Sequence, residues 1–234
     1  MPRKSDVYLI NIAINNYYQS FNELISLMAH TFAAMGLQCT ARRVDTYNPR
    51  SVLEPGAFNI VFGHVTFACD RLLDAHAGAP FILWQLEQLS RDDGFLPRYP
   101  GYLKLLHRAT RLWDYSAANA DVLTSWGLPR AQVLPLGYDP ALQTVPANIE
   151  KDLDVCFFGT LNPRRQTIIE RLNRVGLRVE ARERCYGDER NMLLARSHIA
   201  LNVHSFENVQ ILEDARRSCR LATGWCVVSE YSDA

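Results

Sequence analysis

The sequence lacks the short motifs that mark several large enzyme classes. It has no GxGxxG fingerprint and no GxxxxGK[ST] phosphate loop, which argues against a nicotinamide dehydrogenase and a P-loop protein. It also has no GxSxG elbow and no HExxH motif. None of the six cysteines forms a CxxC pair, so zinc and thioredoxin-like chemistry have little support.

Excess charge, long apolar runs and glycosylation acceptors are also lacking. Lys+Arg and Asp+Glu both number 25, and this balance argues against a nucleic-acid binder. No apolar stretch approaches the roughly 20 residues that span a bilayer, and the N-terminus is typical of a first strand rather than a signal peptide. The chain has no Asn-x-Ser/Thr site, and several cysteines stand in apolar runs. These features predict a cytoplasmic protein with no transmembrane segment and with buried free thiols.

Strand-like and helix-like segments alternate along the first part of the chain. Residues 21–36 have apolar side chains at helical spacing and end at Gly36, a good helix stop. Ser116 or Asn119 could cap a helix over residues 118–127. Such alternation predicts a parallel sheet with helices on both faces. The expected strands are residues 7–13, 39–45, 58–65, 80–89, 111–117 and 132–137, and the expected helices are residues 21–36, 70–79, 102–109 and 118–127.

The alternation stops in the middle of the chain and then begins again. Residues 139–152 hold Pro140 and Pro146 without clear periodicity, which is typical of a domain connection. We therefore predict an α/β protein with two Rossmann-like domains, over residues 1–138 and 153–234. The second offers only four expected strands, where about five or six are usual, so we expect it to be short or truncated. These strands are residues 154–160, 177–183, 198–204 and 225–230, with helices at 164–176, 189–197 and 209–224.

The segment DVCFFGTLNPRR, residues 154–165, predicts a phosphate site. It runs from an apolar strand through Gly159 and a short turn to Arg164 and Arg165, where a helix begins. Glycine removes the side chain that would block a ligand's approach. The helix start offers backbone N–H groups and a positive dipole end, and arginine adds forked donors that match phosphate oxygens. The arrangement suits a diphosphate. The alternative is that the two arginines merely form a solvated helix start.

Further polar residues stand where the strands of the second domain are expected to end. His204 ends one strand and Tyr186 follows another, and open parallel sheets form active clefts at this edge. Glu213, in the next helix, could accept hydrogen bonds from the two hydroxyls of a ribose. The alternatives are a structural histidine at position 204 and a surface ion pair between Glu213 and Arg216 or Arg217.

Taken in order, three segments of the second domain resemble the nucleotide-sugar domain of GT-B fold glycosyltransferases. They are DVCFFGTLNPRR, YGDERNMLLARSHIALNVH and LEDARRSCRLATGWCVVSE. The resemblance is closest to CgeB-like proteins and to proteins like those of glycosyltransferase families 1 and 4. VLPLGYDP resembles the crossing between the domains of that fold, and ILWQLEQLS and LWDYSAAN resemble the end of its first domain. The resemblance covers residues 55–230. The family's final strands and closing helix have no counterpart in this sequence.

The resemblance implies a donor site in the second domain. The loop from Gly159 to Arg165 would hold the diphosphate of a nucleotide sugar, and Glu213 would hold its ribose. Glu207 stands six residues before Glu213, whereas the family pattern is Glu-x7-Glu, which puts a sugar contact of Glu207 in doubt. The reaction implied is transfer of a sugar to an acceptor hydroxyl. The departing diphosphate would be stabilised by arginines and helix N–H groups without a metal, in keeping with the absence of a DxD-type pair after a strand.

Acceptor binding is then expected in the first domain, where His64, Glu87 and Asp114 stand near strand ends. We predict His64 and Glu87 as catalytic residues, because an inverting enzyme needs a general base there. The alternative is a retaining enzyme, which needs none of these residues as a base. The alternatives are a packed loop histidine and a helix cap or salt bridge. The expected acceptor is a glycan, a lipid or a small molecule, with no cofactor besides the nucleotide sugar. Two other functions stay open: a sugar-nucleotide epimerase or hydrolase, and a non-catalytic nucleotide- or partner-binding module.

Overall fold

A computed structural model describes residues 9–14, 18–43, 52–63, 74, 78–89, 98–135, 137, 139–205 and 224–231. The chain divides into two compact units, Met1–Pro135 (unit 1) and Leu136–Asp233 (unit 2). Among the described residues, each unit contains one parallel sheet, of six strands in unit 1 and four in unit 2. The expected α/β fold with two Rossmann-like domains and a smaller second domain is thereby confirmed. Within the described ranges, no helix is long and apolar enough to cross a membrane.

Unit 1 is built on a sheet with the strand order β2-β1-β3-β4-β5-β6. All of the strand pairs are parallel, so their carboxyl ends lie at one edge. The order reverses direction between β1 and β3, as in doubly wound folds. The strands are β1 (Leu9–Ile14), β2 (Gln38–Arg43), β3 (Phe58–Gly63), β4 (Ile82–Gln85), β5 (Arg111–Asp114) and β6 (Gln132–Val133), with helices α1 (Asn22–Ala34), α4 (Pro100–Arg108) and α5 (Ala117–Ser125) and the short 3-10 helix η1 (Tyr18–Phe21).

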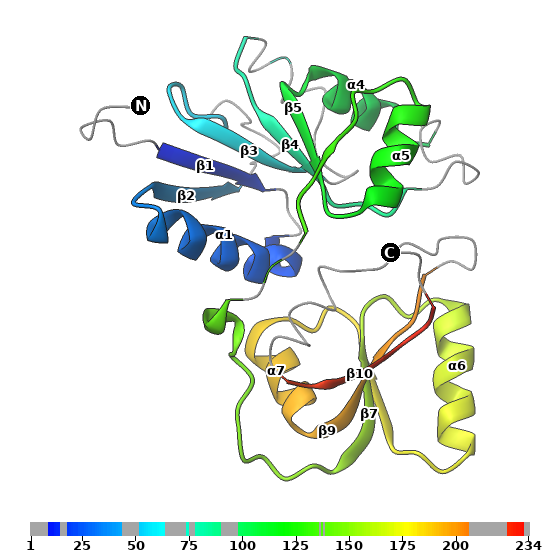
Figure 1. Ribbon diagram of the computed structural model, residues 1–234. Coiled ribbons are helices and arrows are strands. Elements are labelled where there is room, and N and C mark those ends of the chain that lie inside the picture. Colours follow the sequence, from blue (N-terminus) through cyan, green and yellow to red (C-terminus); the bar gives the residue numbers. More distant parts are fainter. Residues whose placement is uncertain are drawn as a thin grey trace. The chain divides into compact units, whose positions relative to one another are not determined.

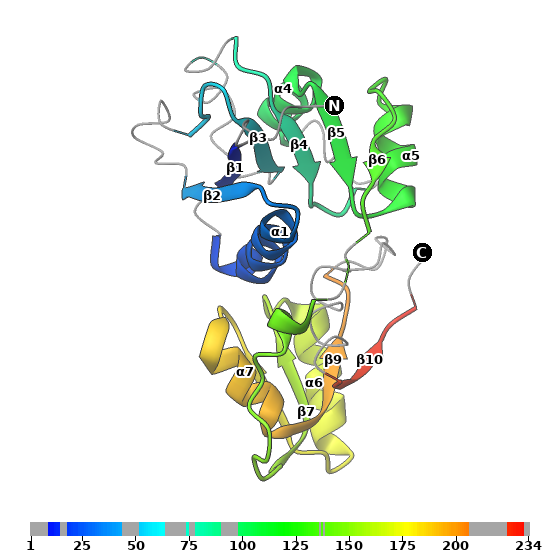
Figure 2. The ribbon, with the colours of Figure 1, turned by 60° about the vertical axis from the view of Figure 1, so that its left-hand side comes forward.

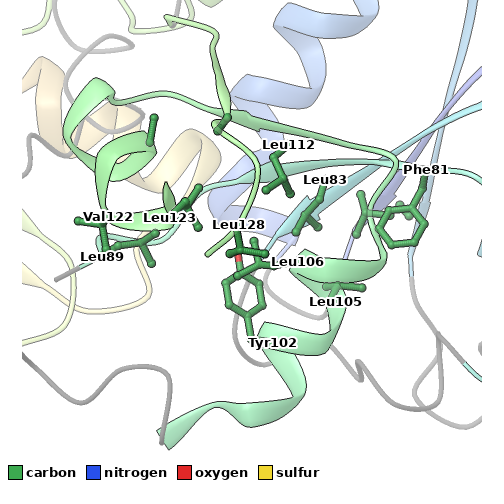
Figure 3. Close-up of a cluster of buried hydrophobic side chains, with 14 of the residues drawn as sticks. Phe81, Leu83, Leu89, Tyr102, Leu105, Leu106, Leu112, Val122, Leu123 and Leu128 are labelled. Carbon is green, nitrogen blue, oxygen red and sulfur yellow. The ribbon is translucent and has the colours of Figure 1, made fainter. Parts of the chain in front are cut away.

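Helices cover both faces of the unit 1 sheet, as Figures 1 and 2 show. On one face, Tyr102 and Leu105 of α4 and Leu123 of α5 pack on Leu83 and Leu112 of the strands in one cluster of buried side chains (Figure 3). The other face carries Phe62 and Trp84, whose rings meet edge to face 5.4 Å apart. Because successive strand residues point to opposite faces, these short apolar strands fill two cores at once.

Two helix boundaries follow from single residues that the sequence marks. α1 ends at Ala34, and Gly36 takes φ 77°, a left-handed conformation that glycine adopts without strain. α5 begins after Ser116, whose side chain accepts a hydrogen bond from the Asn119 N–H. Both predictions are confirmed.

Unit 2 is built on a sheet with the strand order β10-β9-β7-β8. Its strands are again parallel. Residues 143–152, between η3 and β7, form no helix or strand. The elements are η3 (Pro140–Leu142), β7 (Leu153–Phe158), α6 (Pro163–Arg174), β8 (Val179–Arg182), α7 (Gly187–Ala195), β9 (Ser197–Asn202) and β10 (Cys226–Ser229).

The helices α6 and α7 lie on opposite faces of the unit 2 sheet (Figures 1 and 2). Cys156 and Phe158 of β7 pack with Leu193 of α7. The residue between them, Phe157, faces Arg165 of α6, whose guanidinium lies 5.2 Å from the ring centre. The alternation along β7 therefore fixes which helix covers which face. Because α6 follows β7 directly in the chain, it begins at the carboxyl edge of the sheet.

Candidate functional site

The predicted phosphate-binding turn lies at the carboxyl edge of the unit 2 sheet, between β7 and α6. Gly159 takes φ 143°, which side-chain-bearing residues rarely adopt. Asn162 caps α6, because its Oδ1 accepts the Arg165 N–H at 2.9 Å. Its Nδ2 donates to the Ser205 carbonyl at 2.7 Å, which ties the turn to the chain that leaves β9. Pro163 has no N–H, and the Arg165 N–H is already hydrogen-bonded to Asn162. The first turn of α6 therefore offers fewer N–H donors to a ligand than an uncapped helix start would.

Arg165 is turned into unit 2 and holds the turn in place. Its side chain is only 1% exposed. Nε and Nη2 donate to the Val203 carbonyl at 3.0 and 2.7 Å, and Nη1 donates to the Thr160 carbonyl at 3.0 Å. This guanidinium therefore bridges the β7–α6 turn and the end of β9.

Arg164, one position earlier, points to the end of β10 and remains 26% exposed. Its Nη2 donates to Glu230 Oε1 at 2.5 Å and its Nη1 to Glu230 Oε2 at 3.1 Å, a two-point contact between guanidinium and carboxylate. Nη1 also lies 3.1 Å from the His204 carbonyl oxygen. At the sheet edge, the Arg164 guanidinium thus binds a carboxylate of the protein itself, that of Glu230.

Glu230 follows β10 directly and gathers several donors. Its Oε2 accepts the backbone N–H of His204 at 2.7 Å in addition to the contact with Arg164. Partial burial alone would raise the pKa of Glu230, but the hydrogen bonds from Arg164 and from the His204 N–H outweigh it and lower this pKa. Glu230 is therefore held as a carboxylate.

His204 lies at the same edge, but its ring is buried. The residue is 5% exposed, and ring Nε2 lies 3.1 Å from the Tyr231 carbonyl oxygen. A nitrogen in that position must carry the proton to make a hydrogen bond, which fixes the tautomer. The histidine therefore joins the chain after β9 to the chain after β10.

A second carboxylate meets the turn from the neighbouring strand. Glu183 follows β8, and its Oε1 accepts the Leu161 N–H at 2.5 Å. Tyr186 is the half-buried residue that precedes α7, and its side chain does not cap that helix. Sequence reasoning missed Glu183 and Glu230. Both could have been found from their positions, because each immediately follows a strand, at the carboxyl edge of the sheet where the other candidate residues were sought.

The structure brings four of the predicted donor-site residues together, from the ends of β7 and β9 and the start of α6: Gly159, Arg164, Arg165 and His204. Glu207, Glu213 and the predicted catalytic His64 lie outside the described residues, and their roles stay predictions. Among the described residues, no group of three or more His, Cys, Asp or Glu side chains could hold a metal ion.

In unit 1, a buried polar cluster fills the carboxyl edge beside Glu87. Gln85 and Asp114 are register partners at the ends of β4 and β5, and the Gln85 amide donates to Asp114 Oδ2 at 2.9 Å. Asp114 Oδ1 accepts the Ser116 N–H at 2.8 Å and the Asn119 amide at 3.1 Å. Burial raises the pKa of Asp114 to about 7, although these hydrogen bonds act to lower it.

This cluster fixes the backbone of Glu87. Its N–H donates to Gln85 Oε1 at 2.5 Å, and its carbonyl accepts from the Gln85 and Asn119 amides at 2.8 and 2.9 Å. Asn119 Oδ1 also accepts the Leu89 N–H at 3.0 Å. The half-buried Glu87 side chain is therefore presented from a rigid loop. Gln85 was missed by the sequence reasoning, although a polar residue that ends an apolar strand was a usable signal. Asn119 was considered only as a helix cap.

Comparisons with known proteins give a relative in sequence and solved structures that are similar in fold. No protein-family model matches this chain. The chain is 30% identical over 156 residues to an uncharacterized protein of Acanthamoeba polyphaga mimivirus, a match that covers 64% of this chain and 49% of that protein. The chain thus spans about half the length of this relative. The structure is similar to Anabaena Alr3699/HepE in complex with UDP, with a TM-score of 0.55 and 11% sequence identity over 96% of this chain and 81% of that one. At this identity, the likeness concerns the fold alone.

Proposed function

We propose that this protein is a GT-B type glycosyltransferase that moves a sugar from a nucleoside-diphosphate donor to an acceptor hydroxyl. The observation that carries the proposal is the Arg164 guanidinium, which sits partly exposed at the β7–α6 turn and holds a carboxylate in two-point geometry. Phosphate oxygens present the same forked acceptor to arginine. The likeness in fold to a protein solved in complex with UDP supports a nucleotide of this class.

In this proposal, the two adjacent arginines have different tasks. Arg164 contacts the diphosphate, because its side chain lies at the sheet edge and is partly exposed. Arg165 is buried and bonded to the Val203 and Thr160 carbonyls, so it holds the turn and touches no ligand. Gly159 lets the ligand approach the backbone of the turn, and Glu213 would accept hydrogen bonds from the ribose.

The proposed reaction breaks the bond between the anomeric carbon and the diphosphate oxygen, and it forms a bond from that carbon to the acceptor oxygen. Negative charge develops on the departing diphosphate, and the fixed charge of Arg164 stabilises it there without a metal. In an inverting reaction, the proton of the acceptor hydroxyl passes to a base, for which Glu87 and His64 are the candidates. The rigid loop backbone at Glu87 supports its assignment, because a base must be held in position.

Titration calorimetry with UDP, GDP, ADP and dTDP tests the proposal. At least one of them should bind at millimolar concentration or below, and Arg164→Ala should weaken that binding at least about tenfold through loss of charge-assisted hydrogen bonds. Arg174→Ala is the matched control, because Arg174 ends the same helix and pairs with Glu170 at the surface. Failure of all four nucleotides to bind, or equal affinity in the Arg164 and Arg174 variants, would contradict the proposal.

A further inference from the structure

The carboxylate of Glu230 occupies the position on Arg164 that a phosphate group would need. Both carboxylate oxygens contact the guanidinium, at 2.5 and 3.1 Å from Nη2 and Nη1. The same carboxylate accepts the His204 N–H at 2.7 Å. A planar carboxylate and the two oxygens of a phosphate place similar demands on guanidinium donors. Glu230 and a diphosphate therefore compete for the same donor pair.

The ion pair is placed where exchange with a ligand is possible. The side chains of Arg164 and Glu230 are 26% and 30% exposed, whereas the neighbouring Arg165 is 1% exposed. Without Glu230, Arg164 would still be anchored by the α6 backbone and by the His204 carbonyl. Loss of the carboxylate contact therefore releases donors without releasing the side chain from the sheet edge.

Resting on the diphosphate site proposed above, we propose that Glu230 is a specificity-determining residue that acts as an internal competitor. It occupies Arg164 when no nucleotide is bound, and it must yield the guanidinium when a diphosphate binds. A group tethered beside its partner acts at an effective concentration of millimolar order. To displace Glu230 from Arg164, a ligand must therefore carry more negative charge than a carboxylate does. This requirement favours a diphosphate over free carboxylates and other singly charged anions.

The substitution Glu230→Gln isolates this competition. Glutamine keeps the size of the side chain and an oxygen that accepts the His204 N–H, but it removes the charge that opposes a diphosphate. We expect Glu230→Gln to bind UDP about tenfold more tightly than the wild type, which corresponds to about 1.4 kcal/mol. Asp154→Asn is the matched control, because it removes one carboxylate from the start of β7, where Asp154 pairs with Arg178. Its affinity for UDP should equal that of the wild type.

Two further measurements make the test independent of a single variant. In the Arg164→Ala background, Glu230→Gln should lose most of its gain in affinity for UDP, because no guanidinium is then present for Glu230 and the diphosphate to share. In the wild type, saturating UDP should shift the amide resonance of His204, which donates to Glu230, while the same concentration of uridine should not.

The outcomes separate the inference from the proposed function. If the wild type binds UDP but Glu230→Gln binds it equally or more weakly, or if the His204 amide stays unshifted by UDP, the competitor role is wrong and the diphosphate site stands. If neither the wild type nor Glu230→Gln binds any nucleoside diphosphate, both are wrong.

Discussion

Replacing the two adjacent arginines one at a time should separate stability from binding. Arg165→Ala removes three hydrogen bonds from a buried guanidinium to the carbonyls of Val203 and Thr160. It also leaves those carbonyls without their donor and opens space above Phe157. Bonds from charged donors contribute about 1.5–3 kcal/mol each and are not additive. We therefore expect a loss of about 3–5 kcal/mol in the free energy of unfolding of unit 2.

Arg164→Ala should cost much less, because its ion pair with Glu230 is partly exposed and such pairs contribute about 0–1 kcal/mol. Hydrogen exchange of peptides from α6 and β9 is the suitable assay, because it reports the stability of unit 2 separately from that of unit 1. Arg165→Ala should speed exchange across both elements, and Arg164→Ala should leave the exchange rates close to those of the wild type.

The contrast between the variants decides whether the reasoning is right. If the two substitutions accelerate exchange equally, the difference in burial between Arg164 and Arg165 does not make one of them structural and the other not. Exchange unchanged in Arg165→Ala would refute the bridge between the turn and β9. Arg174→Ala, at the exposed end of the same helix, controls for loss of a helical arginine as such.

Two further predictions concern unit 1. Burial raises the pKa of Asp114 from 3.8 to about 7 in the folded state. Between these pH values the folded state therefore binds more protons than the unfolded state does. The free energy of unfolding of unit 1 should then fall as pH rises from about 4 to about 7. Thermal unfolding followed across this window should show the decline, and a curve of the same slope in Asp114→Asn would assign it to another group. A methyl group at Gly63 would lie 2.6 Å from Tyr102 Oη and 3.0 Å from the Trp84 carbonyl oxygen, whereas one at Gly78 would meet no atom of the described residues within 4 Å. Gly63→Ala should therefore destabilise unit 1 by about 1–3 kcal/mol in urea unfolding, and equal midpoints for Gly63→Ala and Gly78→Ala would contradict this packing.

The fold could be predicted from local signals. Alternating strand and helix patterns indicate parallel sheets, and Gly36 and Ser116 mark helix ends through backbone conformation and capping, which depend on near neighbours. These signals act over a few residues, so one sequence is enough to detect them.

The site was only partly predictable, because its contacts depend on direction and register. Arg164 and Arg165 are equivalent in the sequence, but one helical step separates a partly exposed guanidinium from a buried one. Glu230 meets Arg164 only because β10 pairs with β9 in one particular register. The cluster of Gln85, Asp114 and Asn119 likewise requires β4 and β5 to be neighbours. Such information resides in the assembled sheet rather than in any short motif.

The most direct test of the central claim is hydrogen exchange of the wild-type protein with and without saturating UDP. Binding at the carboxyl edge of the unit 2 sheet should slow exchange of the backbone amides between Gly159 and Arg165, which lie between the end of β7 and the start of α6. The amides at the opposite edge, near Asp152 and Arg196, which form an ion pair there, should exchange as before. Unchanged exchange in the turn, or protection confined to the opposite edge, would contradict the account.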